Sequence, residues 1–180
     1  STFDHKIINS WNQTFLEVER YSSGYRPGPA PRGLAYVGLA AYEVCVVGMP
    51  AYRSMSGVWP GFNVPAADPN LDYNYPLAIN ASYHYLLPLF FSKATEQQKA
   101  QVETTYANNL AKYSKNVSQD IIARSEARGA EVAEIIWNYA KTDVIGHEHY
   151  LNPFQGYDWR EHTSSVGHWV PTFPGPGEAM

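Results

Sequence analysis

Hydrophobic residues recur every three or four positions in five stretches of the chain, which is the spacing of one face of an α-helix. The pattern predicts helices over residues 4–21, 30–47, 75–91, 95–113 and 118–140. It is clearest in the last stretch, where the inward positions are Ile122, Ser125, Gly129, Val132, Ile136 and Ala140. No stretch alternates hydrophobic and polar residues for long, and there is no internal repeat. We therefore expect an all-α bundle of about five helices with long irregular loops.

Residues that typically begin helices support these boundaries. Pro31 suits the first turn of the second helix, because its missing N–H has no partner there. Thr95 and Gln98 have the spacing of a capping box, in which each side chain accepts a hydrogen bond from the other's backbone N–H. Ser118 is a favourable first residue for the last helix, and Asp120 lies near the positive end of that helix.

Two long segments interrupt the helical pattern. Residues 48–75 are rich in Pro, Gly, Asn and Asp, but Arg53, Trp59 and Phe62 suggest that the segment packs on the helices. The periodicity is also lost near the end of the chain, where the sequence is aromatic and rich in Pro and Gly. We therefore divide the chain into a helical domain, residues 1–145, and an irregular extension, residues 146–180.

Composition narrows the possible partners. The 180 residues suffice for one sizeable core. Their net charge is -4, and Lys and Arg do not cluster, so we expect no nucleic-acid binding. The longest apolar run, residues 33–49, contains Tyr36, Tyr42 and Glu43 and is too short for a membrane span, so we expect a buried helix. The 14 Tyr, 5 Trp and 7 Phe favour an interface with another domain or with further copies of the chain.

The single cysteine, Cys45, lies inside the apolar run, so an intramolecular disulfide is impossible and a buried, unreactive thiol is expected. A first residue other than Met is compatible with a removed leader peptide or with a trimmed chain. On that basis we expect a periplasmic or extracellular location.

His147 and His149 are the candidate metal ligands, with Asp143 before them and His162 and His168 after them. Neutral imidazoles and carboxylates bind zinc and similar ions. The helical zinc-protease motif, however, places two histidines four positions apart with a Glu between them, whereas these two are two positions apart. We therefore favour hydrogen-bonded loop histidines and expect no metal site.

The remaining polar candidates also have structural interpretations. Arg26 stands at a helix entrance, where it can contact an anion, but pairing with a carboxylate or stacking on a ring is the preferred interpretation. Glu17, Glu19 and Glu43 lie on or near apolar helical faces, where they form either a buried carboxylate cluster or, more commonly, a solvated helix edge. Ser165 lacks a nucleophile elbow, so we expect no catalytic residue in this chain.

Short blocks of sequence, in a fixed order, resemble bacterial vanadium-dependent haloperoxidase-like proteins of the type 2 phosphatidic acid phosphatase superfamily. The blocks are residues 11–21, 26–27, 35–43, 78–84, 141–143, 146–148 and 169–172. The resemblance extends over nearly the whole chain. It implies a fold of two helical bundles, of which this chain is the N-terminal half. It also implies that vanadate or phosphate is bound by the other half, either a separate chain or a missing segment.

The family's oxyanion-binding signature is absent from this sequence. A Lys is expected seven residues before Arg26, and Glu19 stands there instead. The expected Ser-Gly-His is replaced by residues 165–168, which have one residue too many, and Arg160 precedes His162 without the other motifs. The resemblance therefore implies a scaffold half of a halide-oxidising enzyme with no cofactor ligand of its own. The alternatives are half of a related acid phosphatase and a non-catalytic binding or interaction module.

Overall fold

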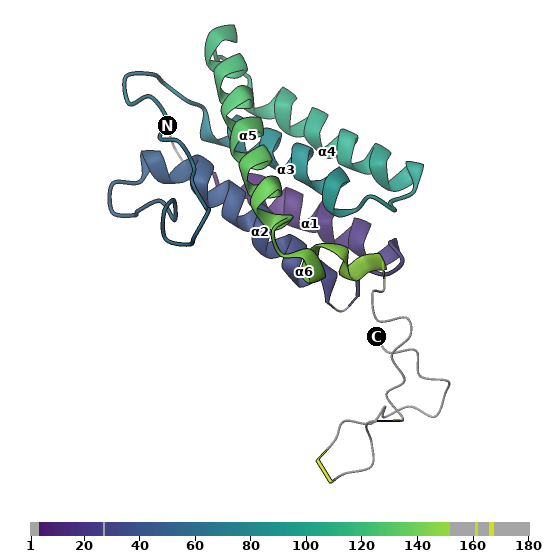
Figure 1. Cartoon of the computed structure of the whole chain (residues 1–180). Helices are drawn as coiled ribbons and strands as arrows, with labels where there is room; N and C mark the ends of the chain where they lie inside the picture. Colours follow the sequence, from purple (N-terminus) through teal and green to yellow (C-terminus); the bar gives the residue numbers. More distant parts are fainter. Residues whose placement is uncertain (1–3, 27, 152–160, 162–165, 168–180) are drawn as a thin grey trace.

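The computed structural model describes residues 4–26, 28–151, 161 and 166–167. These residues form six α-helices and two 3-10 turns, and no strand (Figure 1). The elements are α1 (Lys6–Tyr21), α2 (Pro29–Cys45), η1 (Val46–Gly48), α3 (Tyr75–Phe90), α4 (Glu96–Tyr113), α5 (Gln119–Ala140), α6 (Val144–Glu148) and η2 (His149–Leu151). The all-α class is confirmed, and all five predicted helices are present.

The structure adds the short helix α6 to the predicted elements. The proposed boundary between residues 145 and 146 falls inside it. The Asp143 side chain accepts a hydrogen bond from the Gly146 N–H at 3.1 Å and so caps the first turn. Most of the predicted irregular extension lies outside the described residues.

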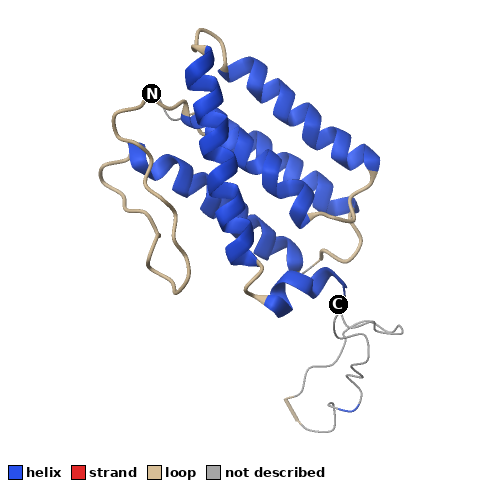
Figure 2. Ribbon diagram, turned by 45° about the horizontal axis from the view of Figure 1, so that its top comes forward, coloured by secondary structure: helices blue, strands red, loops and turns tan. Residues whose placement is uncertain are grey.

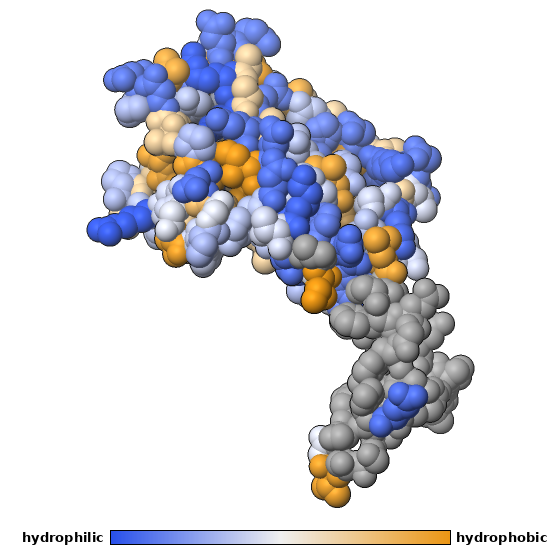
Figure 3. Space-filling view, in the orientation of Figure 1, coloured by the Kyte–Doolittle hydropathy of each residue, from blue (hydrophilic) through white to orange (hydrophobic). Residues whose placement is uncertain are grey.

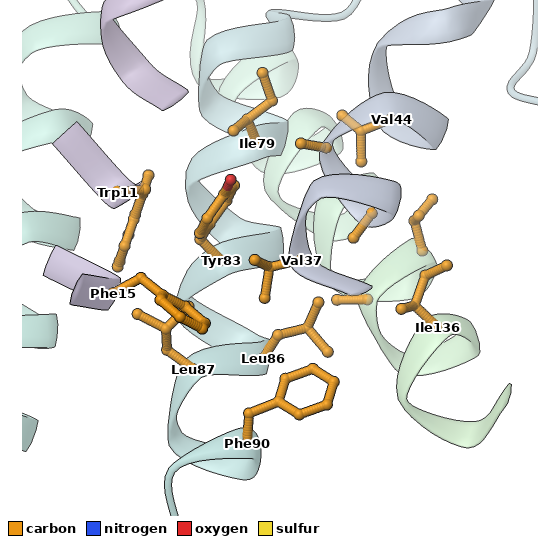
Figure 4. Packing of buried hydrophobic residues seen from close by; sticks show 14 of the residues in the cluster. Trp11, Phe15, Val37, Val44, Ile79, Tyr83, Leu86, Leu87, Phe90 and Ile136 are labelled. Atoms are coloured by element: carbon orange, nitrogen blue, oxygen red, sulfur yellow. The ribbon is translucent and has the colours of Figure 1, made fainter. Parts of the chain in front are cut away.

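Helix α3 occupies the centre of the bundle, with α1, α2, α4 and α5 packed around it (Figure 2). It is apolar on most sides because it has neighbours on most sides. Side chains from α1, α2 and α5 converge on it, including Trp11, Val37 and Ile136 (Figure 4). Tyr85 and Leu89 share the helical spacing of the buried residues of α3, and Tyr85 packs against the core. Both are only partly buried, while Ile79, Leu86 and Leu87 are fully buried.

Glycine allows α3 and α5 to approach each other closely. Gly129 is a buried position on the predicted inner stripe of α5. A Cβ atom added there would clash with the Ala78 carbonyl oxygen of α3 and would lie 2.9 Å from Cβ of Ala81. Because Gly129 has no Cβ atom, α5 can lie this close to α3.

Buried polar side chains join the helices at defined points. Asn80 of α3 is fully buried; it accepts a hydrogen bond from Trp11 Nε1 of α1 at 2.9 Å and donates one to the Tyr106 carbonyl of α4 at 3.0 Å. The predicted capping box of α4 is confirmed, because Thr95 and Gln98 each accept a hydrogen bond from the other's backbone N–H. The two hydrogen bonds of Asn80 join α1 and α4 to α3, while the capping box stabilises the start of α4.

Two buried charged side chains hold the loop of residues 49–74, named the strap, against the bundle. Glu43 of α2 accepts hydrogen bonds from the Ser54 hydroxyl at 2.6 Å and the Met55 N–H at 2.7 Å. Arg128 of α5 donates from Nη2 to the Pro65 carbonyl at 2.6 Å. Phe62 of the strap is fully buried and packs against Tyr139 of α5, with ring centroids 5.0 Å apart. The expected packing of this segment on the helices is confirmed.

The structure also places Cys45 as expected, since it is buried and free. Burial raises the pKa of its thiol to about 12, so almost no thiolate is present at neutral pH. We expect iodoacetamide at pH 8 to modify Cys45 only in denaturant, as measured by the intact mass. Rapid alkylation of the folded protein would contradict this placement. No described helix is long and apolar enough to cross a membrane.

Candidate docking surface

The two candidate metal ligands have different surroundings. His147 packs edge-on against Trp137, with ring centroids 5.0 Å apart, and its pKa is lowered by burial and by the nearby Arg32 guanidinium. His149 begins η2, and its ring lies against Gly28. Within residues 4–26 and 28–151, no group of three or more His, Cys, Asp or Glu side chains is placed to hold a metal ion. His162 and His168 lie outside the described residues.

The arginines that form ion pairs are spread over the fold. Arg26 pairs with Glu19, which confirms the preferred carboxylate interpretation for this arginine. Arg32 pairs with Asp143 at 3.0 Å, and its guanidinium lowers the pKa of that carboxyl. Among the described residues, Arg128 and Glu131 of α5 form the third arginine pair, at 2.7 Å. A vanadate site needs several cations around one oxyanion, so these separate pairs do not fit it.

The three glutamates do not form a buried cluster, because each has its own partner. Glu17 accepts a hydrogen bond from Gln101, Glu19 pairs with Arg26, and Glu43 holds the strap. The preferred solvated edge is nevertheless wrong for two of them, since Glu19 is 5% exposed and Glu43 is 2% exposed. The spacing of residues within one helix does not reveal these hydrogen-bond partners. The partners of Glu43, which are Ser54 and Met55, lie eleven and twelve residues away along the chain.

The outward face of α2 carries no charge. The face, named the α2 surface, consists of positions spaced as on one side of a helix: Pro31, Leu34, Ala35, Gly38 and Tyr42. Leu34 shares the helical spacing of the buried Val37 and Val44, but it is 37% exposed. A helix with apolar residues on both its inner and outer faces is typical of one that is covered on both faces.

Two grooves flank the α2 surface. The aromatic groove has a volume of about 640 Å³ and is lined by Ala35, Tyr36, Gly38, Leu39, Tyr42, Met55, Trp59 and Tyr139. The α1–α2 groove has a volume of about 330 Å³ and is lined by Ile8, Asn12, Leu34, Gly38, Ala41, Tyr42, Cys45, Met49 and Tyr83. Hydrophobic side chains also reach the molecular surface between the strap and α5 (Figure 3). Both grooves lie within the size range of binding pockets.

The chemistry of the grooves favours binding over catalysis. None of their lining residues is Asp, Glu, His, Lys or Arg. The two lining groups with strongly shifted acidities are Cys45 and Tyr83, and burial raises the pKa of each to about 12. Neither group can therefore act as an acid or a base near neutral pH. The surface is suited to packing against an uncharged protein segment.

Comparisons with known proteins supply no relative for this surface. No protein-family model, no curated protein and no solved structure matches the chain. One sequence feature points to the α2 surface. Small and apolar residues occur on the outer as well as the inner side of that helix. The grooves themselves depend on the strap, whose long-range contacts are not visible in the sequence.

Proposed function

We propose that this chain is the N-terminal scaffold half of a vanadium-dependent haloperoxidase-like enzyme, and that a second, catalytic helical half covers its α2 surface. The observation that carries the proposal is the uncharged outward face of α2, exposed beside the α1–α2 groove. Large exposed apolar surfaces are characteristic of protein–protein contacts. The blocks of sequence that resemble haloperoxidase-like proteins support a catalytic half as the partner.

The ion pair between Glu19 and Arg26 supports a scaffold role. Where the family has a Lys that binds the oxyanion, this chain has a buried carboxylate that neutralises the Arg instead. In this proposal the halide is oxidised by hydrogen peroxide at vanadate held by the other half. The residues described here support that half and exclude water from one side of it.

A charge placed in the α1–α2 groove tests the proposal. We expect Leu34→Glu to weaken the association with the catalytic half at least tenfold, because a buried contact would have to desolvate a carboxylate without a partner. Asn108→Glu, at an exposed position of α4, is the matched control and leaves the association unchanged. Native mass spectrometry of the two-half complex measures the bound fraction. If the halves form one polypeptide, a protease site inserted after residue 177 separates them first.

Four results distinguish the alternatives. Peroxide-dependent bromination by the assembled halves supports the haloperoxidase, whereas hydrolysis of a phosphate ester supports the related acid phosphatase. Equal association of Leu34→Glu and Asn108→Glu with the second half contradicts docking at this groove. Copies of this chain alone, with neither activity, are the result expected of a non-catalytic interaction module.

A further inference from the structure

The aromatic groove presents flat rings from three parts of the fold. Tyr36 and Tyr42 belong to α2, Trp59 to the strap and Tyr139 to α5. Trp59 stacks on Tyr139 with ring centroids 6.5 Å apart. Grooves lined by aromatic residues bind proline-rich segments, because such segments are already extended in the polyproline II conformation and lose little entropy on binding. This groove has no charged lining residue and therefore favours an uncharged segment.

Contacts outside the groove keep its walls in place. The Tyr42 hydroxyl donates to the Arg53 carbonyl at 2.6 Å, and Glu43 accepts from the Met55 N–H at 2.7 Å. Phe62 lies beneath Trp59, with ring centroids 5.5 Å apart. A groove that is already formed binds its occupant without spending free energy on ordering its own walls.

The chain itself contains a segment with matching chemistry. Residues 169–177 have the sequence Trp-Val-Pro-Thr-Phe-Pro-Gly-Pro-Gly, with prolines at positions 171, 174 and 176 and no charged residue. They lie outside the described residues. We propose that this segment binds in the aromatic groove of the same chain as an extended, polyproline II-like strand.

The segment is close enough to reach the groove. The described chain leads to η2, where His149 lies against Gly28 immediately before α2. At 1.5 Å per residue, Tyr42 is roughly 20 Å along α2 from Gly28. Residues 152–168 can span up to roughly 55 Å when extended. Because the segment is tethered, its effective concentration is high and even weak binding fills the groove.

This interaction goes beyond the proposed function because it needs only one chain. The second half is assigned to the α1–α2 groove, which shares Gly38 and Tyr42 with the aromatic groove but differs from it in its other lining residues. Failure of one assignment therefore leaves the other intact, and the test of the segment uses this chain without any partner.

The methionines provide the readout. Met55 lines the aromatic groove, Met49 lines the α1–α2 groove, and Met180 is the third methionine of the chain. We expect the methyl NMR signal of Met55 to shift when Pro171, Pro174 and Pro176 are all replaced by Ala, because the Trp169 and Phe173 rings leave the groove. The Met49 signal stays in place and serves as the internal control.

A synthetic peptide of residues 168–180, added in excess to the triple variant, returns the Met55 signal to its wild-type position. The same peptide with its three prolines replaced by Ala does not. An identical Met55 signal in the wild type and the triple variant would overturn the proposal. A wild-type Met55 signal that changes on dilution would also overturn it, because the groove would then take the segment of another copy.

Discussion

Gly129→Ala is expected to lower the free energy of unfolding by about 2–3 kcal/mol, although alanine is the better helix former. The added methyl group has no space, because the Ala78 carbonyl and the Ala81 side chain of α3 already touch this point of α5. Either the two central helices move apart or the hydrogen-bonded backbone of α3 is displaced. Urea unfolding monitored by circular dichroism measures the change.

Gly38→Ala is the matched control for this substitution. It places the same methyl group in the middle of a helix, but a Cβ atom at Gly38 has no neighbour within 4 Å. We expect it to stabilise the isolated chain by up to about 1 kcal/mol through helix propensity. Equal effects of the two substitutions would show that the close contact between α3 and α5 is absent.

Asn80→Ala is expected to destabilise the chain by about 3 kcal/mol. The substitution leaves the Trp11 Nε1–H and the Tyr106 carbonyl without their partner in the interior. Each buried polar group left without a hydrogen bond lowers the stability of a protein by about 1–3 kcal/mol. It also loosens α1 and α4 from α3 together. Urea unfolding, followed by tryptophan fluorescence and by circular dichroism, measures the loss.

Asn108→Ala provides the comparison, because Asn108 lies exposed on α4. We expect its free energy of unfolding to stay within about 0.5 kcal/mol of that of the wild type. A similar small effect for Asn80→Ala would contradict the assignment of Asn80 as the link between α1, α3 and α4.

The helices could be predicted because their signals are local. Periodic apolar residues, the Thr95 capping box and the inner stripe of α5 all lie within single elements. The central position of α3 is a property of the whole assembly, so the spacing of its apolar residues does not tell that Tyr85 and Leu89 are only partly buried. Helix α6 was missed because it is five residues long, although Asp143 was available as a capping signal.

The candidate docking surface was harder to predict than the fold. Leu34 shares the apolar spacing of the α2 core residues, and the sequence alone does not tell which side of α2 remains uncovered. The aromatic groove depends on Glu43 and Arg128, which hold the strap through hydrogen bonds to distant residues. Burial of Glu43 was not expected, because its two partners lie in an irregular segment.

The scaffold proposal is tested most directly by native and denaturing mass spectrometry of the protein purified from its natural host. We expect a second helical half, present either as a non-identical chain in a complex or as a continuation of the same polypeptide. Its sequence contains a Lys seven residues before Arg-Pro, followed by Ser-Gly-His. Occurrence of this chain alone, or only with copies of itself, would contradict the scaffold proposal.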